Sequence, residues 1–285
     1  MVYTERITWE RRWCDVGSVR THYAVTGQAG RSPIVLLHGI GRSLEDWSET
    51  ALLARDYRLY ALDLVGFGYT EKPEGAYTLA YLAQFVHDFL VALDETGSVV
   101  LIGNSLGGAV AQTFAVAHPE RTRGLVLVAS AGFGKEVILT LRLITVPGLG
   151  ELLMRPSRRS ARGRLESLFH DPRFITESRV THTLSLAQQP GAARAFLATA
   201  RNLGTWRGIR RAWRDALTQR LTPLQIPTLL IWGENDQVLP AQHLEAAAQV
   251  YPHAQTHLFR ETGHAPQLER ADEFNALIRE FLEDV

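Results

Sequence analysis

The stretch that decides the fold is an apolar run entering a glycine-rich turn, Val99-Val100-Leu101-Ile102-Gly103-Asn104-Ser105-Leu106-Gly107-Gly108. Its first four residues favour a strand that is buried on both faces. Residues 109–115, after the turn, favour a helix. The turn contains G-x-S-x-G, which has chemical meaning where a strand precedes it and a helix follows it. We therefore predict a strand, a sharp turn at Ser105 and a helix.

Short apolar runs alternate with helical patterns on both sides of this turn. Apolar residues recur at i, i+3, i+4 and i+7 within 82–93 and again within 274–282, which predicts two amphipathic helices. The alternation predicts an α/β fold with a mostly parallel sheet, whose first two strands form an antiparallel edge. The predicted strands are 13–16, 20–25, 33–37, 58–62, 99–102, 125–128, 227–232 and 255–259.

Residues 131–222 interrupt the alternation, because they lack strand-like runs and are rich in Arg, Leu and Ala. We predict a helical insertion here, with the prolines of 221–227 returning the chain to the sheet. The insertion holds 16 Lys+Arg and 6 Asp+Glu, a balance of +10 that the rest of the chain offsets. We expect the two surfaces to pair and the outer face to be solvated; the alternative is attraction of acidic substrates or an anionic membrane.

Composition excludes several classes of protein. The chain has 285 residues with 30 Lys+Arg, 30 Asp+Glu and 46% hydrophobic residues, as in ordinary globular proteins. The zero net charge argues against nucleic acid as a partner, and no apolar run is long enough for a membrane span. One cysteine, Cys14, excludes an internal disulfide. Residues 1–6 lack the features of a signal peptide, so we expect a cytoplasmic protein.

Ser105 is the candidate nucleophile. A sharp turn forces it into a strained backbone conformation, and the small residues at 103 and 107 let strand and helix approach closely. Its hydroxyl then lies at a helix N-terminus, whose partial positive charge favours a developing anion. The alternative is an ordinary Gly/Ser turn.

A serine needs a base and a group that orients this base. His264 lies just after the last predicted strand, at its carboxyl end, and is the best of the ten histidines. The acid should follow another strand between serine and histidine, and Asp236 is favoured there, with Glu234 as the alternative. Residues 129–134, after the 125–128 strand, contain no acid.

Charge that develops on the substrate oxygen needs hydrogen-bond donors, each worth about 2.7–4 kcal/mol when measured by removal. One should be the N–H of Leu106, directly after the nucleophile. We favour Ile40 for the other, because the loop His38-Gly39-Ile40-Gly41 follows the 33–37 strand. His38 itself is expected to brace this loop by hydrogen bonding.

These motifs together resemble the α/β-hydrolase superfamily over residues 13–130 and 223–283. The similar elements, in chain order, are His38-Gly39, 63–68, 103–107, Gly233-x-x-Asp236 and Gly263-His264. The resemblance implies an eight-stranded sheet flanked by helices, with a core of 1–130 and 223–285 and a helical cap of 131–222 inserted after the sixth strand. It also implies that Ser105, Asp236 and His264 form a triad, that the amides of Ile40 and Leu106 form the oxyanion hole, and that Asp63 belongs to a structural turn.

The residue at the nucleophile position narrows the chemistry. Serine at 105 argues against haloalkane dehalogenase and epoxide hydrolase activities, because the dehalogenases and epoxide hydrolases that the chain resembles use aspartate at this position. Asn104 makes the turn resemble that of hydrolases that cleave carbon–carbon bonds in meta-cleavage products of aromatic degradation. Two features of the chain depart from that subfamily. Its members tend to have a glycine-rich stretch with proline after His-Gly, where this chain has Ile40-Gly41-Arg42-Ser43. They also tend to have tryptophan after the catalytic histidine, where this chain has Ala265.

We predict a cofactor-independent serine hydrolase that cleaves carboxylic esters of small to medium size through an acyl-enzyme. The alternatives are carbon–carbon bond hydrolysis of meta-cleavage products and a ligand receptor with a hydrolase fold. No metal site is predicted, since there is no H-E-x-x-H and no Cys/His cluster. The partner is a small-molecule substrate, and a homo-oligomer is possible. Candidate substrate-binding residues are Trp47, Asn104, Phe133, Leu139 and Val238.

Overall fold

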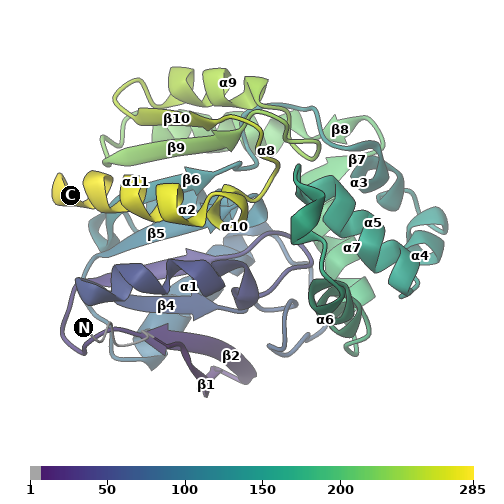
Figure 1. Cartoon of the computed structure of the whole chain (residues 1–285), viewed down its shortest axis with the longest axis horizontal. Coiled ribbons are helices and arrows are strands. Elements are labelled where there is room, and N and C mark those ends of the chain that lie inside the picture. Colours follow the sequence, from purple (N-terminus) through teal and green to yellow (C-terminus); the bar gives the residue numbers. More distant parts are fainter. Residues whose placement is uncertain (1–7) are drawn as a thin grey trace.

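The computed structural model describes residues 8–285; residues 1–7, and with them the expectation about a signal peptide, lie outside the described part. Its centre is one eight-stranded sheet in the order β1-β2-β4-β3-β5-β6-β9-β10 (Figure 1). The strands are β1 (Glu10–Val16), β2 (Val19–Thr26), β3 (Pro33–Leu37), β4 (Arg58–Leu62), β5 (Val99–Asn104), β6 (Thr122–Val128), β9 (Thr228–Gly233) and β10 (Gln255–Phe259). Each predicted strand is confirmed.

Only β2 runs against the other strands, because it pairs antiparallel with both β1 and β4 while the remaining pairs are parallel. The predicted antiparallel edge is therefore confirmed. The parallel register sets Leu37 of β3 beside Gly103 of β5, and Asn104 beside Val128 of β6. Consequently the loops that follow β3, β5 and β6 meet at one edge of the sheet.

Both faces of the sheet are covered, as the continuous apolar strands require. Val35 and Leu37 pack into one hydrophobic cluster, whereas Ile34 and Leu36 pack into another on the opposite face. The first cluster includes α1 (Leu79–Ala92), α2 (Leu106–Ala117) and α9 (Gln242–Val250). The second includes η1 (Leu44–Arg55) and α11 (Ala271–Glu283). Two short elements, η2 (Pro119–Arg121) and α10 (Pro266–Glu269), complete this layered core.

The segment between β6 and β9 lies beyond one end of the sheet and is mostly helical (Figure 1). Its elements are α3 (Leu139–Ile144), α4 (Leu149–Leu153), α5 (Arg158–Leu168), η3 (Pro172–Phe174), α6 (Glu177–Ala187), α7 (Ala192–Leu203), β7 (Gly204–Thr205), β8 (Gly208–Ile209) and α8 (Arg211–Leu221). In residues 8–285, no helix has both the length and the apolar composition to cross a bilayer.

Two features of this segment differ from the sequence analysis. The strands β7 and β8 pair as a small antiparallel hairpin where no strand was predicted, because two residues are too few to give a pattern. Helix α8 contacts α2 of the core, and its Leu217 and Leu221 are buried in the core cluster. The range 131–222 therefore includes one helix that packs on the sheet layer.

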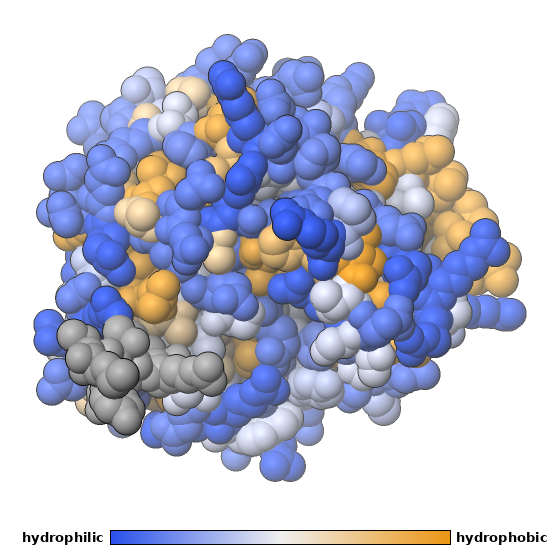
Figure 2. All heavy atoms as spheres, in the orientation of Figure 1, coloured by the Kyte–Doolittle hydropathy of each residue, from blue (hydrophilic) through white to orange (hydrophobic). Residues whose placement is uncertain are grey.

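The expected pairing between the basic insertion and the acidic body is limited. Arg194 and Glu74, 3.2 Å apart, are the one arginine–carboxylate pair between the two among residues 8–285. Other arginines of the insertion, such as Arg201 with Glu151 at 2.8 Å, pair within it. The outer surface is also partly apolar (orange at the right of Figure 2), with exposed Leu139, Leu152, Leu153 and Trp206. Much of the positive charge on the insertion thus lacks a partner from the body.

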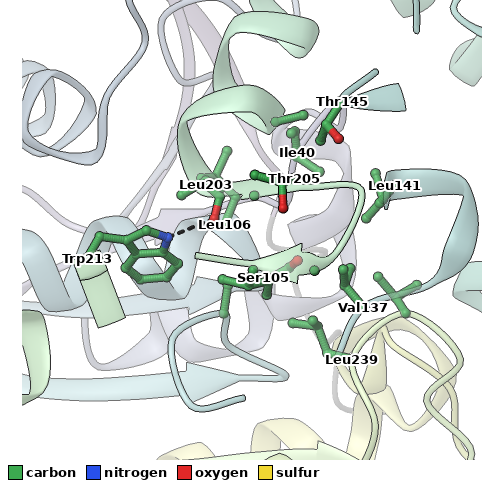
Figure 3. Close-up of a pocket in the computed structure, with 16 residues that line it drawn as sticks. Ile40, Ser105, Leu106, Val137, Leu141, Thr145, Leu203, Thr205, Trp213 and Leu239 are labelled. Atoms are coloured by element: carbon green, nitrogen blue, oxygen red, sulfur yellow. Dashed lines mark hydrogen bonds between the residues drawn. The ribbon is translucent and has the colours of Figure 1, made fainter. Parts of the chain in front are cut away.

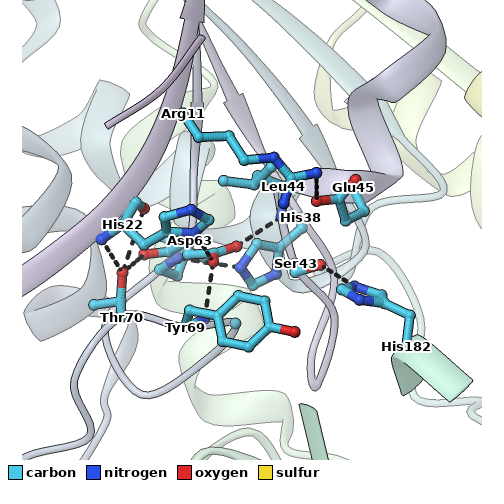
Figure 4. Close-up of polar contacts among 12 residues, drawn as sticks. Arg11, His22, His38, Ser43, Leu44, Glu45, Asp63, Tyr69, Thr70 and His182 are labelled. Carbon is cyan, nitrogen blue, oxygen red and sulfur yellow. Dashed lines mark hydrogen bonds and ion pairs between the residues drawn. The ribbon is translucent and has the colours of Figure 1, made fainter. Parts of the chain in front are cut away.

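A buried aspartate fixes the turn after β4 (Figure 4). The Asp63 carboxylate accepts hydrogen bonds from Leu44 N at 2.7 Å and Tyr69 N at 2.9 Å, and lies 2.7 Å from His22 Nδ1. A Cβ at Gly68, which has φ +54°, would lie 2.1 Å from the Asp63 carboxyl carbon, so glycine is required there. The structural role predicted for Asp63 is confirmed, and it anchors the start of η1 beside the loop 38–43.

Candidate active site

Ser105 occupies a strained turn between β5 and α2. Its φ of 57° and ψ of −113° place it in a region that non-glycine residues rarely adopt. A Cβ at Gly103 would lie 2.3 Å from Gly107 O, and one at Gly107 would lie 2.1 Å from Leu37 O. Only glycine fits at these two positions, so the predicted close approach of strand and helix is confirmed. The Ser105 side chain projects at the N-terminus of α2, where the helix dipole favours negative charge.

The predicted acid and base are in contact. Asp236 Oδ2 lies 2.6 Å from His264 Nδ1, and the two side chains are 0% and 4% exposed. Asp236 Oδ1 accepts hydrogen bonds from Val238 N at 2.8 Å and Leu239 N at 2.9 Å. The carboxylate therefore has three donors in fixed positions and orients the imidazole through Nδ1. Glu234, the alternative acid, is exposed, and within residues 8–285 its carboxylate accepts a single hydrogen bond, at 3.3 Å from the backbone N of residue 261.

Ser105 and His264 line the same cavity, which has a volume of about 1270 Å³ including space open to solvent. We call it the main cavity. Among the hydrogen bonds of residues 8–285, none joins the Ser105 hydroxyl to His264. Such contacts are often longer in ligand-free enzymes than in their substrate complexes. In the described part of the chain, the Ser105 and His264 side chains thus line one cavity without a hydrogen bond between them.

The loop after β3 passes close to Ser105, and the orientation of one of its peptide groups is fixed by hydrogen bonds. His38 Nδ1 lies 2.7 Å from Gly39 O, and Arg42 N donates to the same oxygen at 3.2 Å. The peptide between residues 39 and 40 is planar and trans, so the Ile40 N–H points away from His38 and Arg42. Gly39 is close to Ser105, because a Cβ at Gly39 would lie 3.4 Å from Ser105 Cβ.

The bracing role predicted for His38 is confirmed. Its Nε2 accepts a hydrogen bond from Leu64 N at 3.1 Å, while Nδ1 donates to Gly39 O. Burial lowers the pKa of His38, which keeps this imidazole neutral and both hydrogen bonds intact. His38 is therefore a fixed support of the loop.

A second hollow, the side cavity of about 550 Å³, also contains Ser105 and is shown in Figure 3. It is lined by Ile40, Leu106, Leu141 of α3 and residues of the β7–β8 hairpin. Trp213 closes it with its indole N–H donating to Leu203 O at 2.8 Å. Both predicted oxyanion donors thus border the space at the nucleophile.

Three predicted substrate-binding residues lie elsewhere. Trp47 is fully buried in the cluster on the opposite face of the sheet, because η1 covers that face. Phe133 packs edge-on against Trp232 and Tyr251 in the core, and Leu139 is 58% exposed on the outer side of α3. None of the three lines the main or side cavity.

The other two predictions, Asn104 and Val238, do line the main cavity. Sequence reasoning missed several residues that line it, and these share positions on the inner faces of the inserted helices: Leu141, Ile144, Arg164, Thr183 and Phe196. Leu141 and Ile144 are three residues apart on α3, so a helical phase assigned to α3 would have found them in place of Leu139.

Asn104 has a structural task. Its Nδ2 donates to Val128 O at 3.2 Å and to His264 O at 3.0 Å. The amide therefore connects the nucleophile turn to the loop that carries the histidine.

The histidine loop is also tied to the insertion through one carboxylate. Glu269 Oε1 accepts a hydrogen bond from Gly263 N at 2.7 Å, and Oε2 accepts from the backbone N–H groups of residues 170–171, both at 2.9 Å. In addition, His264 N donates to Leu168 O, the end of α5, at 2.8 Å. This set of contacts, the Glu269 clamp, satisfies backbone groups of both segments.

No three His, Cys, Asp or Glu side chains within residues 8–285 are arranged to hold a metal ion. Around Ser105 the cavities present its hydroxyl and the His264 imidazole with its carboxylate, while arginine side chains and further hydroxyls line other parts of the main cavity.

Comparison with known proteins places the chain in a family. Residues 32–271 match the family model for the alpha/beta hydrolase fold. A curated relative, the dihydrolipoyllysine-residue acetyltransferase component of the acetoin cleaving system of Cupriavidus necator, is 34% identical over 95% of this chain and 68% of that protein. The 2-hydroxymuconate semialdehyde hydrolase of Pseudomonas sp. strain CF600 is 32% identical over 88% of this chain and 86% of that protein.

Solved structures agree with this. A meta-cleavage product hydrolase superposes with a TM-score of 0.81 at 28% identity, covering 98% of this chain and 99% of that chain. A serine hydrolase involved in carbazole degradation gives a TM-score of 0.81 at 26% identity, covering 98% and 100%. The chain belongs to the alpha/beta hydrolase family.

Proposed function

We propose that this protein is a serine hydrolase that cleaves carboxylic esters of small to medium size. The observation that carries the proposal is the 2.6 Å contact between His264 and Asp236 at the cavity that contains Ser105. The lining of that cavity is rich in aliphatic side chains, with an aromatic ring from Phe196, which suits an acyl chain of moderate length.

In this mechanism Ser105 Oγ attacks the carbonyl carbon, and His264 Nε2 takes the hydroxyl proton. Asp236 stabilises the imidazolium that forms, and the amides of Ile40 and Leu106 stabilise the oxyanion. His264 then gives the proton to the leaving alkoxide. Water attacks the acyl-enzyme with His264 as base, which releases the acid and restores Ser105.

The insertion acts as the cap of the site in this proposal, because α3, α5, α6 and α7 contribute side chains to the main cavity. The proposal includes a cytoplasmic location, which the single thiol of Cys14 supports, since it leaves no internal disulfide.

A phosphonate that labels only an activated serine, followed by assays on nitrophenyl esters of graded chain length, tests the proposal. Labelling and turnover should be lost in Ser105→Ala and retained in Ser167→Ala, a second hydroxyl that lines the same cavity. Without labelling of the wild-type chain, the hydrolase-fold receptor is the better description.

Carbon–carbon bond hydrolysis is the second candidate. Three curated relatives at 29–32% identity carry names of such hydrolases, including the one from strain CF600. Asn104 argues for the ester reaction, because its amide N–H groups are engaged by two backbone carbonyls and so are not free to bind an extended dianion. Efficient turnover of a meta-cleavage dienoate with only slow ester turnover would reverse the order of the two candidates.

A further inference from the structure

Arg164 of α5 lines the main cavity together with Ser105 and His264. Its guanidinium carbon lies 5.6 Å from the centre of the Phe196 ring, and Nη2 donates to Met154 Sδ at 3.4 Å. A thioether is a weak acceptor and a ring face carries no formal charge. Within residues 8–285, no carboxylate lies within salt-bridge distance of Arg164.

Neighbouring arginines differ in this respect. Arg158 and Arg162, on the same helix, are exposed and both pair with Glu177. Arg42, which also borders the main cavity, pairs with the buried Asp46 at 2.5 Å. Arg164 is thus a cation that faces the cavity without a counter-ion.

The surroundings strengthen the positive character of this region. Arg164 also borders a small adjoining cavity of about 290 Å³ whose lining includes Lys72. Lys72 Nζ donates to backbone oxygens of residues 68 and 70, and burial lowers its pKa to about 8. No acidic side chain of the described chain lines either cavity.

A half-buried guanidinium is costly without an anion, and it does not lose its proton to relieve that cost. Burial and the charge of Arg42 lower the pKa of Arg164, as expected for a desolvated cation. The contact with the Phe196 ring helps to hold the guanidinium in place, and its fork of N–H groups matches a carboxylate in two-point contact.

We propose that Arg164 forms a binding subsite for a carboxylate group of the substrate, so that the enzyme prefers esters with an anionic end over neutral esters of the same length. The proposal rests on the ester hydrolysis proposed above. The reacting carbonyl then lies at Ser105, and the carboxylate is held by Arg164, which lines the same cavity.

Kinetics on matched substrates form the first arm of the test. The probes are mono-4-nitrophenyl esters of dicarboxylic acids from succinate to suberate, each beside the neutral 4-nitrophenyl ester of equal carbon number. We expect the ratio of kcat/KM for the anionic over the neutral ester to peak at one chain length and to fall roughly 10- to 100-fold in Arg164→Gln. Arg164→Lys should restore part of the ratio, and Arg162→Gln, on the same helix, should leave it unchanged.

Binding without turnover forms the second arm and separates this proposal from the proposed function. In the Ser105→Ala variant, calorimetry should detect binding of the free dicarboxylate of the preferred length. This binding should be lost in the double variant that combines Ser105→Ala with Arg164→Gln. Dicarboxylate binding without ester turnover in the wild type would retain the subsite and remove the esterase. An unchanged ratio in a folded Arg164→Gln variant, or dicarboxylate binding equal in both Ser105→Ala backgrounds, would overturn the subsite.

Discussion

Replacing Asp236 by asparagine turns one carboxylate oxygen into an NH₂ group. The hydrogen bonds around the side chain decide which of the two oxygen positions this NH₂ group takes. Oδ1 accepts two backbone N–H groups, from Val238 and Leu239, while Oδ2 faces His264 Nδ1. In Asp236→Asn, the amide oxygen takes the place with two donors, so the amide NH₂ faces the imidazole. Nδ1 must then accept, and the proton moves to Nε2. An imidazole in this tautomer cannot take the proton of Ser105.

The size of the effect follows from the cost of turning the amide. The reversed orientation leaves two backbone N–H groups facing an NH₂ group, at about 1–3 kcal/mol each, or roughly 2–6 kcal/mol in total. The active tautomer is therefore disfavoured by a factor of about 30 to 20,000. The upper part of this range agrees with the loss of about 10⁴ for the same substitution in a well-studied serine protease triad.

The assay is kcat on the best nitrophenyl ester at fixed pH, beside the rate of phosphonate labelling, since both depend on the base. Glu234→Gln is the matched control, because it neutralises an exposed carboxylate two residues away and should change kcat by less than about threefold. If Asp236→Asn loses less than tenfold, or Glu234→Gln loses more than Asp236→Asn, the assignment of the acid is refuted.

Three further substitutions test the site. Asn104→Ala should lower kcat modestly by freeing His264 O, measured on the same ester. Gly107→Ala should prevent folding or cost several kcal/mol in urea unfolding, because a Cβ would lie 2.1 Å from Leu37 O; a normal midpoint would contradict this. The lowered pKa of His38 means that the unfolded chain binds its proton more readily, so stability is complete above pH 6.5 and falls below it. His38→Gln should therefore flatten the fall in unfolding free energy between pH 7 and pH 5. An equally steep fall in the variant would contradict this assignment.

The sheet could be predicted from the sequence because its central strands are buried on both faces. Such strands read as continuous apolar runs, and register then brings the loops after β3, β5 and β6 together. The candidate triad was placed at three strand ends, and the structure brings its acid and base into contact. The choice of Asp236 over Glu234 rested on position, and the physical reason lies in the two backbone N–H groups that hold Asp236 inside the protein.

The lining of the cavity could not be predicted in the same way, because it depends on which face of a helix turns inward. Trp47 was misplaced because η1, a 3-10 helix of 12 residues without a clear pattern, covers the other face of the sheet. Arg164 was hidden among the fifteen arginines of the insertion, which the sequence could not sort into paired and unpaired. The structure makes the distinction, because it shows Glu177 paired with the exposed Arg158 and Arg162 of the same helix and not with Arg164.

The Glu269 clamp has a consequence for exchanging parts between members of the family. Inserted segments are natural candidates for swapping as cassettes, since this one leaves and rejoins the sheet between two adjacent strands, β6 and β9. Here the end of α5 supplies the carbonyl of Leu168 to the backbone of His264, and Glu269 takes one N–H from the histidine loop and two from the insertion. A graft that omits these partners leaves the His264 N–H and one oxygen of the Glu269 carboxylate without hydrogen-bond partners. Transplanted specificity therefore requires residues 168–171 to stay with the recipient.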